Sequence, residues 1–372
     1  MATVQIASPT PFRLTPARIV ALLLAAAALV GIAVAARSGI GADRIRNPSI
    51  EGGGQRPVDP LFGFDHWITL HQVGTVVMMI VLVTVFVVGW RRQPGNPVLL
   101  MVLATTLLVW QDPIMNWAPY AVYNPELWHW PETWPLVSMS PTVEPFIVIG
   151  YATFYMAPFF PATRLLRRIQ ARKPVDHFVW RHPLVSLSLL ILAIGFLFDA
   201  CLEIFLVRTQ LYIYSHVIPW GSFAAGEWYQ FPLIWESALV STVMIPAGVL
   251  LHKDDTGKTQ AEKLAQRLRW FRSRPSLGTF AVMFLIVNLG YFFLYGGGFA
   301  LMKGTGAASS VACPWPYPEA KVYDPQGFYE EAGQVGPYFP GIWSGWQSGQ
   351  LDGRPDVDLP ADGGGRCGLG HG

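Results

Sequence analysis

The chain has 372 residues, of which 52% are hydrophobic and only 13% are charged. A soluble domain has about 25% charged residues, so the composition argues against ordinary soluble domains and favours a polytopic membrane protein. The formal net charge of +2 is nearly balanced, which gives no basis for nucleic-acid binding.

Seven apolar stretches are long enough to span a membrane, because about 20 helical residues cross the hydrocarbon core. They cover 19–36, 68–89, 98–117, 142–160, 184–207, 232–251 and 277–301. Prolines disturb two of them, since Pro113 lies within the third and Pro141 and Pro161 bound the fourth. The predicted fold class is therefore all-α, a polytopic transmembrane helical bundle of about seven spans.

These stretches divide the chain into five parts. We expect a cytoplasmic N-terminal tail (1–18), a first anchor (19–36), an extracytoplasmic loop (37–67), a six-helix core (68–301) and an irregular C-terminal tail (302–372) that is partly disordered. The first stretch could instead be a cleaved signal peptide. Its 18 apolar residues exceed the usual signal core of about 7–15 residues, which favours a retained anchor.

Lys and Arg orient the predicted bundle. With the N-terminus inside, the cytoplasmic segments carry 17 of these residues and the opposite side carries nine. The positive-inside rule then predicts a multi-pass protein with an N-in, C-out orientation. The expected location is the bacterial plasma membrane. On the inner side, the segment 261–274 places Leu264, Leu268 and Phe271 on one face among basic residues, which is typical of an interfacial amphipathic helix.

Five carboxylates lie within the apolar stretches, and the predicted orientation places all of them toward the outer side. They are Asp112, Glu144, Asp199, Glu203 and Glu236. An acid within a membrane is costly and usually faces the bundle interior or a wet cavity. Asp199 and Glu203 are four residues apart, as are Asp112 and Asn116, so each pair shares one helix face.

These acids also have structural explanations. They could cap helices, form hydrogen bonds across the bundle or lie at the interface; Glu144, three residues after Pro141, would complement a helix dipole in a first turn. Asp199 and Glu203 have no evident partner, and a carboxyl pair that shares a proton suits acid–base chemistry. We therefore expect them to be the catalytic pair, with Asp112 and Glu236 as secondary candidates and Asn116 orienting one of them.

The loop after the third stretch is rich in aromatic residues, with five tryptophans and two tyrosines between 110 and 134. An interfacial aromatic belt explains most tryptophans in such a place. The alternative is an aromatic roof over a pocket, in which ring faces stabilise a cationic transition state. On that alternative the candidates for substrate binding are Glu144, Trp117, Tyr123, Asn124, Trp128, His129 and Trp235.

Several other chemistries lack their motifs in the sequence. There is no HxxxH or HxxHH cluster, no Walker A loop and no GxSxG elbow, and the last apolar stretch has no lysine for a retinal Schiff base. We therefore expect neither a metal nor a cofactor. Cys313 and Cys367 both fall in the predicted exported tail, where a disulfide can form.

Four segments carry a family resemblance: WQDPIMNWAPYAVYNPELWHWP, SPTVEPFIVIGYATFY, FDACLEIFLVRTQLYIY and FPLIWES. In this order they resemble the spirocyclase AveC family, membrane proteins associated with spiroketal formation in avermectin-type polyketide biosynthesis. The resemblance covers roughly 60–300. It implies a cyclase- or dehydratase-like enzyme of secondary metabolism, acting without a redox cofactor on a polyketide-like or lipidic hydroxy-ketone. It carries over no catalytic residues, so the candidates above rest on burial and charge.

Other functions remain open at this point. A proton-coupled transporter of a small hydrophobic molecule would also contain buried acids, but we find no internal repeat and no acids in the cytoplasmic half. A membrane terpenoid cyclase would use similar acids and aromatics. A non-catalytic scaffold leaves Asp199 and Glu203 unexplained. The expected partners are a hydrophobic small-molecule substrate and the lipid bilayer, without nucleic acid, and the oligomeric state is open.

Overall fold

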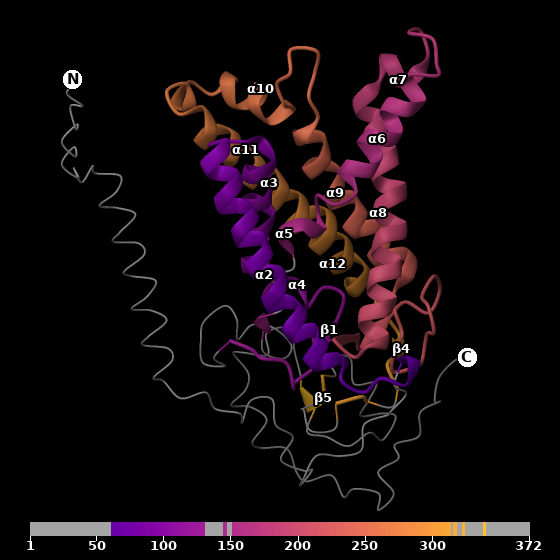
Figure 1. Cartoon of the computed structure of the whole chain (residues 1–372). Coiled ribbons are helices and arrows are strands. Elements are labelled where there is room, and N and C mark those ends of the chain that lie inside the picture. The colour runs from indigo at the N-terminus through magenta and orange to yellow at the C-terminus, as the bar shows by residue number, and fades with distance from the viewer. Residues whose placement is uncertain are drawn as a thin grey trace, which may run out of the picture.

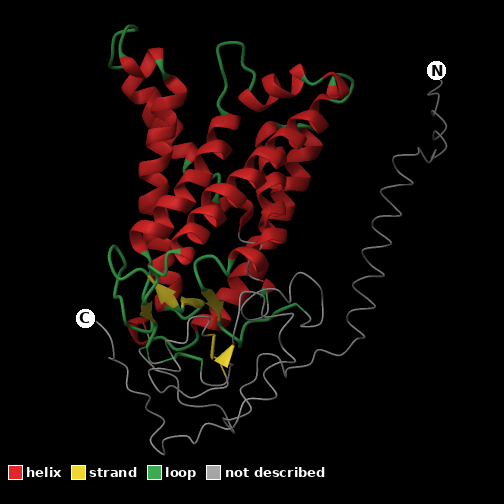
Figure 2. Ribbon diagram, turned by 180° about the vertical axis from the view of Figure 1, so that it is seen from behind, coloured by secondary structure: helices red, strands yellow, loops and turns green. Residues whose placement is uncertain are grey.

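A computed structural model describes residues 61–130, 144–146, 151–313, 315–317, 322–323 and 338–339. These residues form a bundle of long helices with short strands gathered at one end (Figures 1 and 2). Among them, five helices are long and apolar enough to cross a membrane: Trp67–Arg92, Pro97–Met115, Pro183–Arg208, Leu233–Leu251 and Pro275–Met302. The protein is therefore a mostly helical membrane protein.

The long helices follow five of the predicted stretches. They are α2 (Trp67–Arg92); α3 (Pro97–Thr106), continued by η2 (Leu107–Gln111) and α4 (Asp112–Met115); α8 (Pro183–Arg208); α9 (Leu233–Leu251); and α11 (Pro275–Gly290), continued by η6 (Tyr291–Gly296) and α12 (Gly297–Gly304). Proline begins α3, α8 and α11, where its missing N–H costs no helical hydrogen bond. The predicted anchor 19–36 lies outside the described residues.

The expected spanning helix over 142–160 is wrong. Its described residues contain the single turn α5 (Tyr151–Phe154), then turns, then the start of α6 (Phe159–Gln170). Pro158 and Pro161 explain the break, because each lacks the N–H that a continuous helix needs; Pro161 lies in the first turn of α6, where this is tolerated. From there α6 is amphipathic, with exposed arginines at 164, 167 and 168.

The two ends of the bundle differ in chemistry. At the end that we call the basic end lie α6, α7 (Phe178–Arg181), α10 (Gln260–Arg267) and η5 (Arg269–Phe271) (Figure 1). A capping box of Thr259 and Glu262 begins α10, and the predicted amphipathic segment 261–274 is divided at Leu268. Which side of the membrane this end faces remains a prediction from the charge distribution.

Within the described residues, the opposite end, called the strand end, holds three two-stranded sheets. They pair β1 (Ala121–Tyr123) with β2 (Tyr212–Tyr214) and β3 (His216–Val217) with β4 (Ser310–Val311), both antiparallel, and β5 (Val322–Tyr323) with β6 (Tyr338–Phe339) in parallel. Cys313, beside β4, is disulfide-bonded, whereas Cys201 is a free thiol. Cys367 and the rest of the tail from 340 onward lie outside the described residues.

A π-helical turn keeps the last span aligned with the core. Its buried residues recur every four positions at Met283, Val287, Tyr291, Tyr295 and Phe299. An α-helix turns by about 100° per residue, so a four-residue repeat drifts by about 40° at each step. The wider turn of η6 offsets that drift. As a result, the rings of Tyr291, Tyr295 and Phe299 pack in sequence, with centroids 5.2 and 5.3 Å apart.

We expect the substitution Gly278→Ala to loosen the contact between α11 and the α10–η5 segment. An added Cβ would lie 2.6 Å from the Cβ of Phe271 and 3.3 Å from the Cβ of Ala265, and neither atom can rotate away. Overpacking of this kind costs about 1–3 kcal/mol, so the Tm of the protein in detergent should fall.

Gly290→Ala, on the same helix, is the matched control for that measurement. Its nearest neighbour would be the Cγ of Pro246 at 3.5 Å, an ordinary contact. Alanine favours a helix over glycine by about 0.8–1 kcal/mol, so the Tm of this variant should hold or rise. Equal Tm values for the two variants would contradict the packing described here.

Candidate functional site

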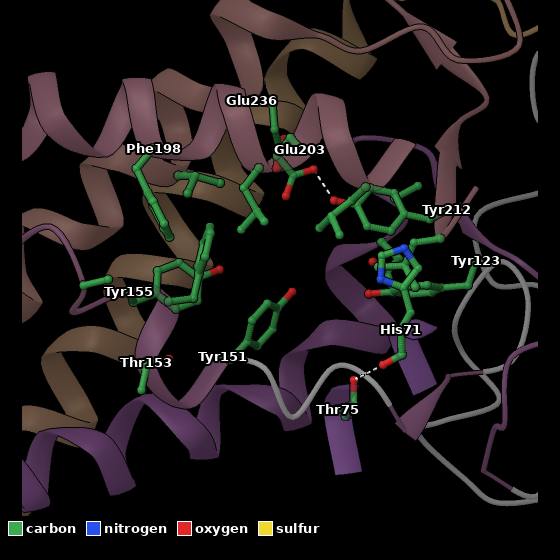
Figure 3. Close-up of a pocket in the computed structure, with 18 of the residues that line it drawn as sticks. His71, Thr75, Tyr123, Tyr151, Thr153, Tyr155, Phe198, Glu203, Tyr212 and Glu236 are labelled. Atoms are coloured by element: carbon green, nitrogen blue, oxygen red, sulfur yellow. Dashed lines mark hydrogen bonds between the residues drawn. The ribbon is translucent and has the colours of Figure 1, made fainter. Parts of the chain in front are cut away.

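A cavity of about 420 Å³ lies between α2 and the rest of the bundle, in the half near the strand end. Its walls come from α2, α5, α8, α9, η6 and the β1–β2 sheet. Six of the residues that line it are tyrosines: Tyr123, Tyr151, Tyr155, Tyr212, Tyr214 and Tyr295. Glu203 and Glu236 line it as well (Figure 3). The cavity therefore combines carboxyl groups with phenols.

Glu203 of α8 is held by two phenols. Its Oε2 accepts hydrogen bonds from the hydroxyl of Tyr212 and, at 3.0 Å, from that of Tyr214. Alternate residues of a strand point to the same face, so β2 presents both phenols to the same carboxyl group. Burial, followed by the charge of Glu203, raises the pKa of Tyr212 and Tyr214 well above 10. Both phenols therefore stay neutral and donate.

Glu236, in the first turn of α9, is on the same wall as Glu203 (Figure 3). Its Oε1 accepts a hydrogen bond from the hydroxyl of Tyr295 at 3.0 Å. Asp199 is fully buried one turn from Glu203, beside Ser237 of α9, but it does not line the cavity. The four-residue step moves Asp199 about 6 Å along the helix axis. We call Asp199, Glu203 and Glu236 the glutamate cluster.

A second group, called the Asp112 cluster, consists of Asp112, Asn116 and Glu144, all of them buried. The Asn116 amide donates to Oδ2 of Asp112 at 3.0 Å and to Oε2 of Glu144 at 3.3 Å. Asp112 also accepts hydrogen bonds from the hydroxyls of Tyr123, at 3.2 Å, and Tyr151. Asn116 and both tyrosines line the cavity, so they connect the buried Asp112 to it.

The two clusters meet the cavity from different sides. Figure 3 shows Tyr151 pointing into the cavity from the side opposite Glu203 and Glu236. The Tyr151 hydroxyl also lies 3.4 Å from that of Tyr291, whose ring stacks on Tyr295 at 5.2 Å. A molecule in the cavity can therefore contact carboxyl groups on one side and phenol hydroxyls on the other.

Three of the predicted binding residues have structural contacts away from the cavity. Trp117 is buried in a cluster with Trp315 and Tyr317. The Asn124 amide donates to the Gln210 carbonyl at 2.8 Å and so ties the turn after β1 to the start of β2. Trp235 donates to the Trp220 carbonyl at 2.9 Å. The cavity lining includes none of the three predicted residues.

The remaining predicted residues fall into two groups. Trp128 has 56% of its surface exposed, and His129 forms a bridge with Pro145 and contacts the Trp130 carbonyl; neither lines the cavity. Tyr123 does line it, and Glu144 is connected to it through Asn116. The structure thus brings together Asn116, Tyr123, Glu203 and Glu236, with Asp112 and Glu144 one hydrogen bond behind them.

Most of the phenols were missed in the sequence analysis, as was His71. Two patterns could have indicated them: the Tyr-x-Tyr of β2, and the four-residue spacing of Tyr151 with Tyr155 and of Tyr291 with Tyr295. His71 of α2 lines the cavity and its Nε2 lies 2.7 Å from the Thr209 hydroxyl. Within the described residues, no group of three or more His, Cys, Asp or Glu side chains is arranged to hold a metal ion.

We expect Tyr151→Phe to destabilise the protein by about 1–3 kcal/mol, the cost of removing a donor from a buried acceptor. The acceptor is Asp112, which is 1% exposed. Tyr229→Phe is the control. Arg208 contacts the ring of Tyr229 at 4.3 Å, and this substitution keeps the ring. Chemical denaturation in detergent measures both variants, and equal stabilities would show that the Tyr151 hydroxyl does not support Asp112.

Comparison with known proteins identifies a family for this chain. The family described as Spirocyclase AveC-like matches residues 90–323, a range that contains both clusters and more than half of the chain. No curated protein and no solved structure matches the chain. The chain belongs to the AveC-like spirocyclase family, which supports a cyclase- or dehydratase-like biosynthetic role in a membrane protein.

Proposed function

We propose that this protein is a membrane-embedded cyclase that closes a spiroketal, or dehydrates an alcohol, by carboxyl acid–base catalysis on a polyketide-like or lipidic hydroxy-ketone. The observation that carries the proposal is the presence of Glu203 and Glu236 on one wall of a single cavity, each with a phenol donor. A volume of about 420 Å³ lies within the range of small-molecule sites, roughly 300–1,000 Å³. The family membership supports the reaction class.

Crowding of the acids supplies the catalytic proton in this proposal. Asp199, Glu203 and Glu236 are all less than 10% exposed, and none forms an ion pair with Lys, Arg or His of the described residues. Three adjacent carboxyl groups cannot all be ionised in an apolar surrounding without cations. At least one of them therefore carries a proton, and it can give this proton to a substrate oxygen.

The first half of the proposed reaction removes water from a hemiketal. A carboxylic acid at Glu203 donates its proton to the hemiketal hydroxyl, the carbon–oxygen bond breaks, and water leaves an oxocarbenium ion behind. The resulting carboxylate and the faces of the surrounding tyrosine rings stabilise this cation. The phenols of Tyr212 and Tyr214 then hydrogen-bond to the new carboxylate, as they do in the structure.

The second half closes the ring. The remaining hydroxyl of the substrate attacks the cationic carbon and loses its proton to the Glu236 carboxylate, so that one keto-diol gives one spiroketal and one water. The proton gained by Glu236 equals the proton given by Glu203, and passage between the neighbouring groups restores the starting state. Dehydration of an alcohol uses the same acid, with the base removing a proton from the adjacent carbon.

The Asp112 cluster has a positioning role in this scheme. Its donors Asn116, Tyr123 and Tyr151 face the cavity, and Asp112 fixes all three side chains by accepting from each. Their oxygen and nitrogen atoms can bind those substrate oxygens that do not react at the glutamate cluster. Holding two reacting groups in place is itself a large part of catalysis in ring closure.

We expect Glu203→Gln to lower product formation by about 100-fold or more, the usual range for loss of a general acid. The measurement is mass spectrometry of metabolites from a producing strain, with membrane abundance of the protein checked in parallel. An uncyclised keto-diol or an undehydrated alcohol should accumulate. Trp128→Phe, at an exposed residue away from the cavity, should leave the profile unchanged.

Asp199→Asn separates the members of the glutamate cluster. Because Asp199 does not line the cavity, we expect a smaller loss of product than for Glu203→Gln at equal abundance. A normal profile for Glu203→Gln would reject the acid–base proposal. Normal amounts of product that stay inside the cells would instead support transport.

A further inference from the structure

Helix α2 stands apart from the rest of the bundle. None of its residues is buried against the described residues, whereas every other spanning segment is between 33% and 56% buried. At the strand end it is held by His71, which contacts the Thr209 hydroxyl at 2.7 Å, and by Gln72, whose side-chain oxygen accepts from the backbone N–H of Trp128 at 2.9 Å. Between its ends, α2 forms one wall of the cavity.

The wall opposite this part of α2 belongs to α8. Leu70, Gly74 and Met78 of α2 and Phe198 and Leu202 of α8 all line the cavity. Leu70 is 49% exposed and Phe198 is 37% exposed. Both helices are long and apolar enough to cross a membrane, so their exposed apolar faces are suited to contact with lipid tails.

The polar groups of the cavity lie deeper. Glu203, Tyr155 and Tyr212 are 8%, 2% and 8% exposed. Moving inward from Leu70 and Phe198, the lining thus changes from exposed hydrocarbon to buried carboxyl and phenol groups. This gradient matches a molecule with a hydroxylated end and an apolar arm.

Described residues also close both ends of the cavity. At the strand end, every residue of β1 and β2 is buried, and Leu127 and Phe231 pack against them. Toward the basic end, Val240, Val243 and Met244 continue α9 beyond Glu236, and all three are buried in the main core. Among the described residues that line the cavity, the exposed ones are Leu70, Gly74 and Phe198, which lie on α2 and α8.

We infer that the cavity opens sideways between α2 and α8, and that the protein takes its substrate directly from the bilayer. The substrate class is an amphiphile whose hydroxyl and keto groups reach the glutamate cluster while an apolar arm remains between the two helices. This assignment of the reacting groups rests on the proposed function, whereas the route does not. The family match begins at residue 90, so most of α2 (Trp67–Arg92), which forms one side of this opening, lies outside the match.

Transfer through lipid is favourable for such a molecule. Each CH₂ kept out of water is worth about 0.8 kcal/mol, so an arm that stays in hydrocarbon need never be exposed to water. The hydroxyl groups exchange their water for the phenols and carboxyls of the inner wall. A polar entrance would reverse this order, with charged groups at the rim and hydrocarbon at the bottom.

Thiol labelling of Val240→Cys tests the route. The substitution is made with Cys201→Ser, because Cys201 is a free exposed thiol, and full-length protein is labelled in proteoliposomes. Val240 lines the cavity but is only 3% exposed. We expect lipid-soluble phenylmaleimide to label residue 240 at least tenfold faster than a methanethiosulfonate reagent that carries a charged sulfonate group does. Mass spectrometry of the peptide containing residue 240 measures both rates, each normalised to the unfolded protein.

Blocking the opening provides the second arm. Nothing lies within 4 Å of a Cβ added at Gly74, so a side chain can begin at this position without a clash, and Gly74→Trp adds an indole ring to the cavity lining. It should slow phenylmaleimide labelling at residue 240 about tenfold. Val77→Trp is the matched control, because Val77 is 55% exposed on the same helix and does not line the cavity; it should leave the rate unchanged.

The sideways route is overturned if the charged reagent labels residue 240 faster, or if Gly74→Trp and Val77→Trp give the same rate. Neither result requires turnover. Labelling as expected together with a normal metabolite profile for Glu203→Gln would keep the route and reject the proposed chemistry. Loss of product in Glu203→Gln with labelling from water would do the opposite.

Discussion

A carboxyl group within a membrane-spanning bundle is stabilised by hydrogen bonds, because an unsatisfied or unpaired acid costs several kcal/mol in an apolar surrounding. Phenols supply these bonds to three of the acids, whereas within the described residues neither carboxyl oxygen of Asp199 has a hydrogen-bond partner. Tyr212 and Tyr214 donate to Glu203, Tyr295 donates to Glu236, and Tyr123 and Tyr151 donate to Asp112. The β1–β2 sheet, the break around α5 and the π-helical turn η6 each place at least one of these tyrosines. The irregular elements of the bundle are therefore the ones that supply its donors.

The choice of donor matters for function. A lysine or arginine would hold its partner as a fixed carboxylate, since an adjacent positive charge favours the ionised form. A neutral phenol stabilises a carboxylate without fixing its charge, so the acid can still gain and lose a proton. Burial and nearby acids also keep the phenols of Tyr123, Tyr212 and Tyr214 protonated, with pKa values well above 10. The same arrangement thus stabilises the fold and leaves Glu203 available for proton transfer.

Sequence reasoning predicted the local features and missed those that depend on tertiary contacts. Hydropathy identified five spanning helices to within a few residues, and the segments around Asp112 and Asp199 identified the family. The helix over 142–160 was wrong because the chain turns over residues 155–158, up to Pro158, and hydropathy does not register that proline. Residue spacing placed Asp199 and Glu203 on one helix face. It could not predict that Glu203 lines the cavity and that Asp199 does not. Tyr151, Tyr212 and Tyr295 come from three distant segments, so no local pattern could have brought them together. Trp117 and Trp128 were predicted to bind substrate because they are aromatic, yet neither lines the cavity.

In the proposed reaction a substrate oxygen meets Glu203 inside the cavity. The most direct test is a cryo-electron microscopy structure of Glu203→Gln purified from producing cells, in which unconverted substrate should stay bound. We expect density in the cavity, with a substrate oxygen about 2.6–3.2 Å from the side chain at position 203 and an apolar arm between α2 and α8. Substrate density at any other place, with the cavity empty, would contradict it.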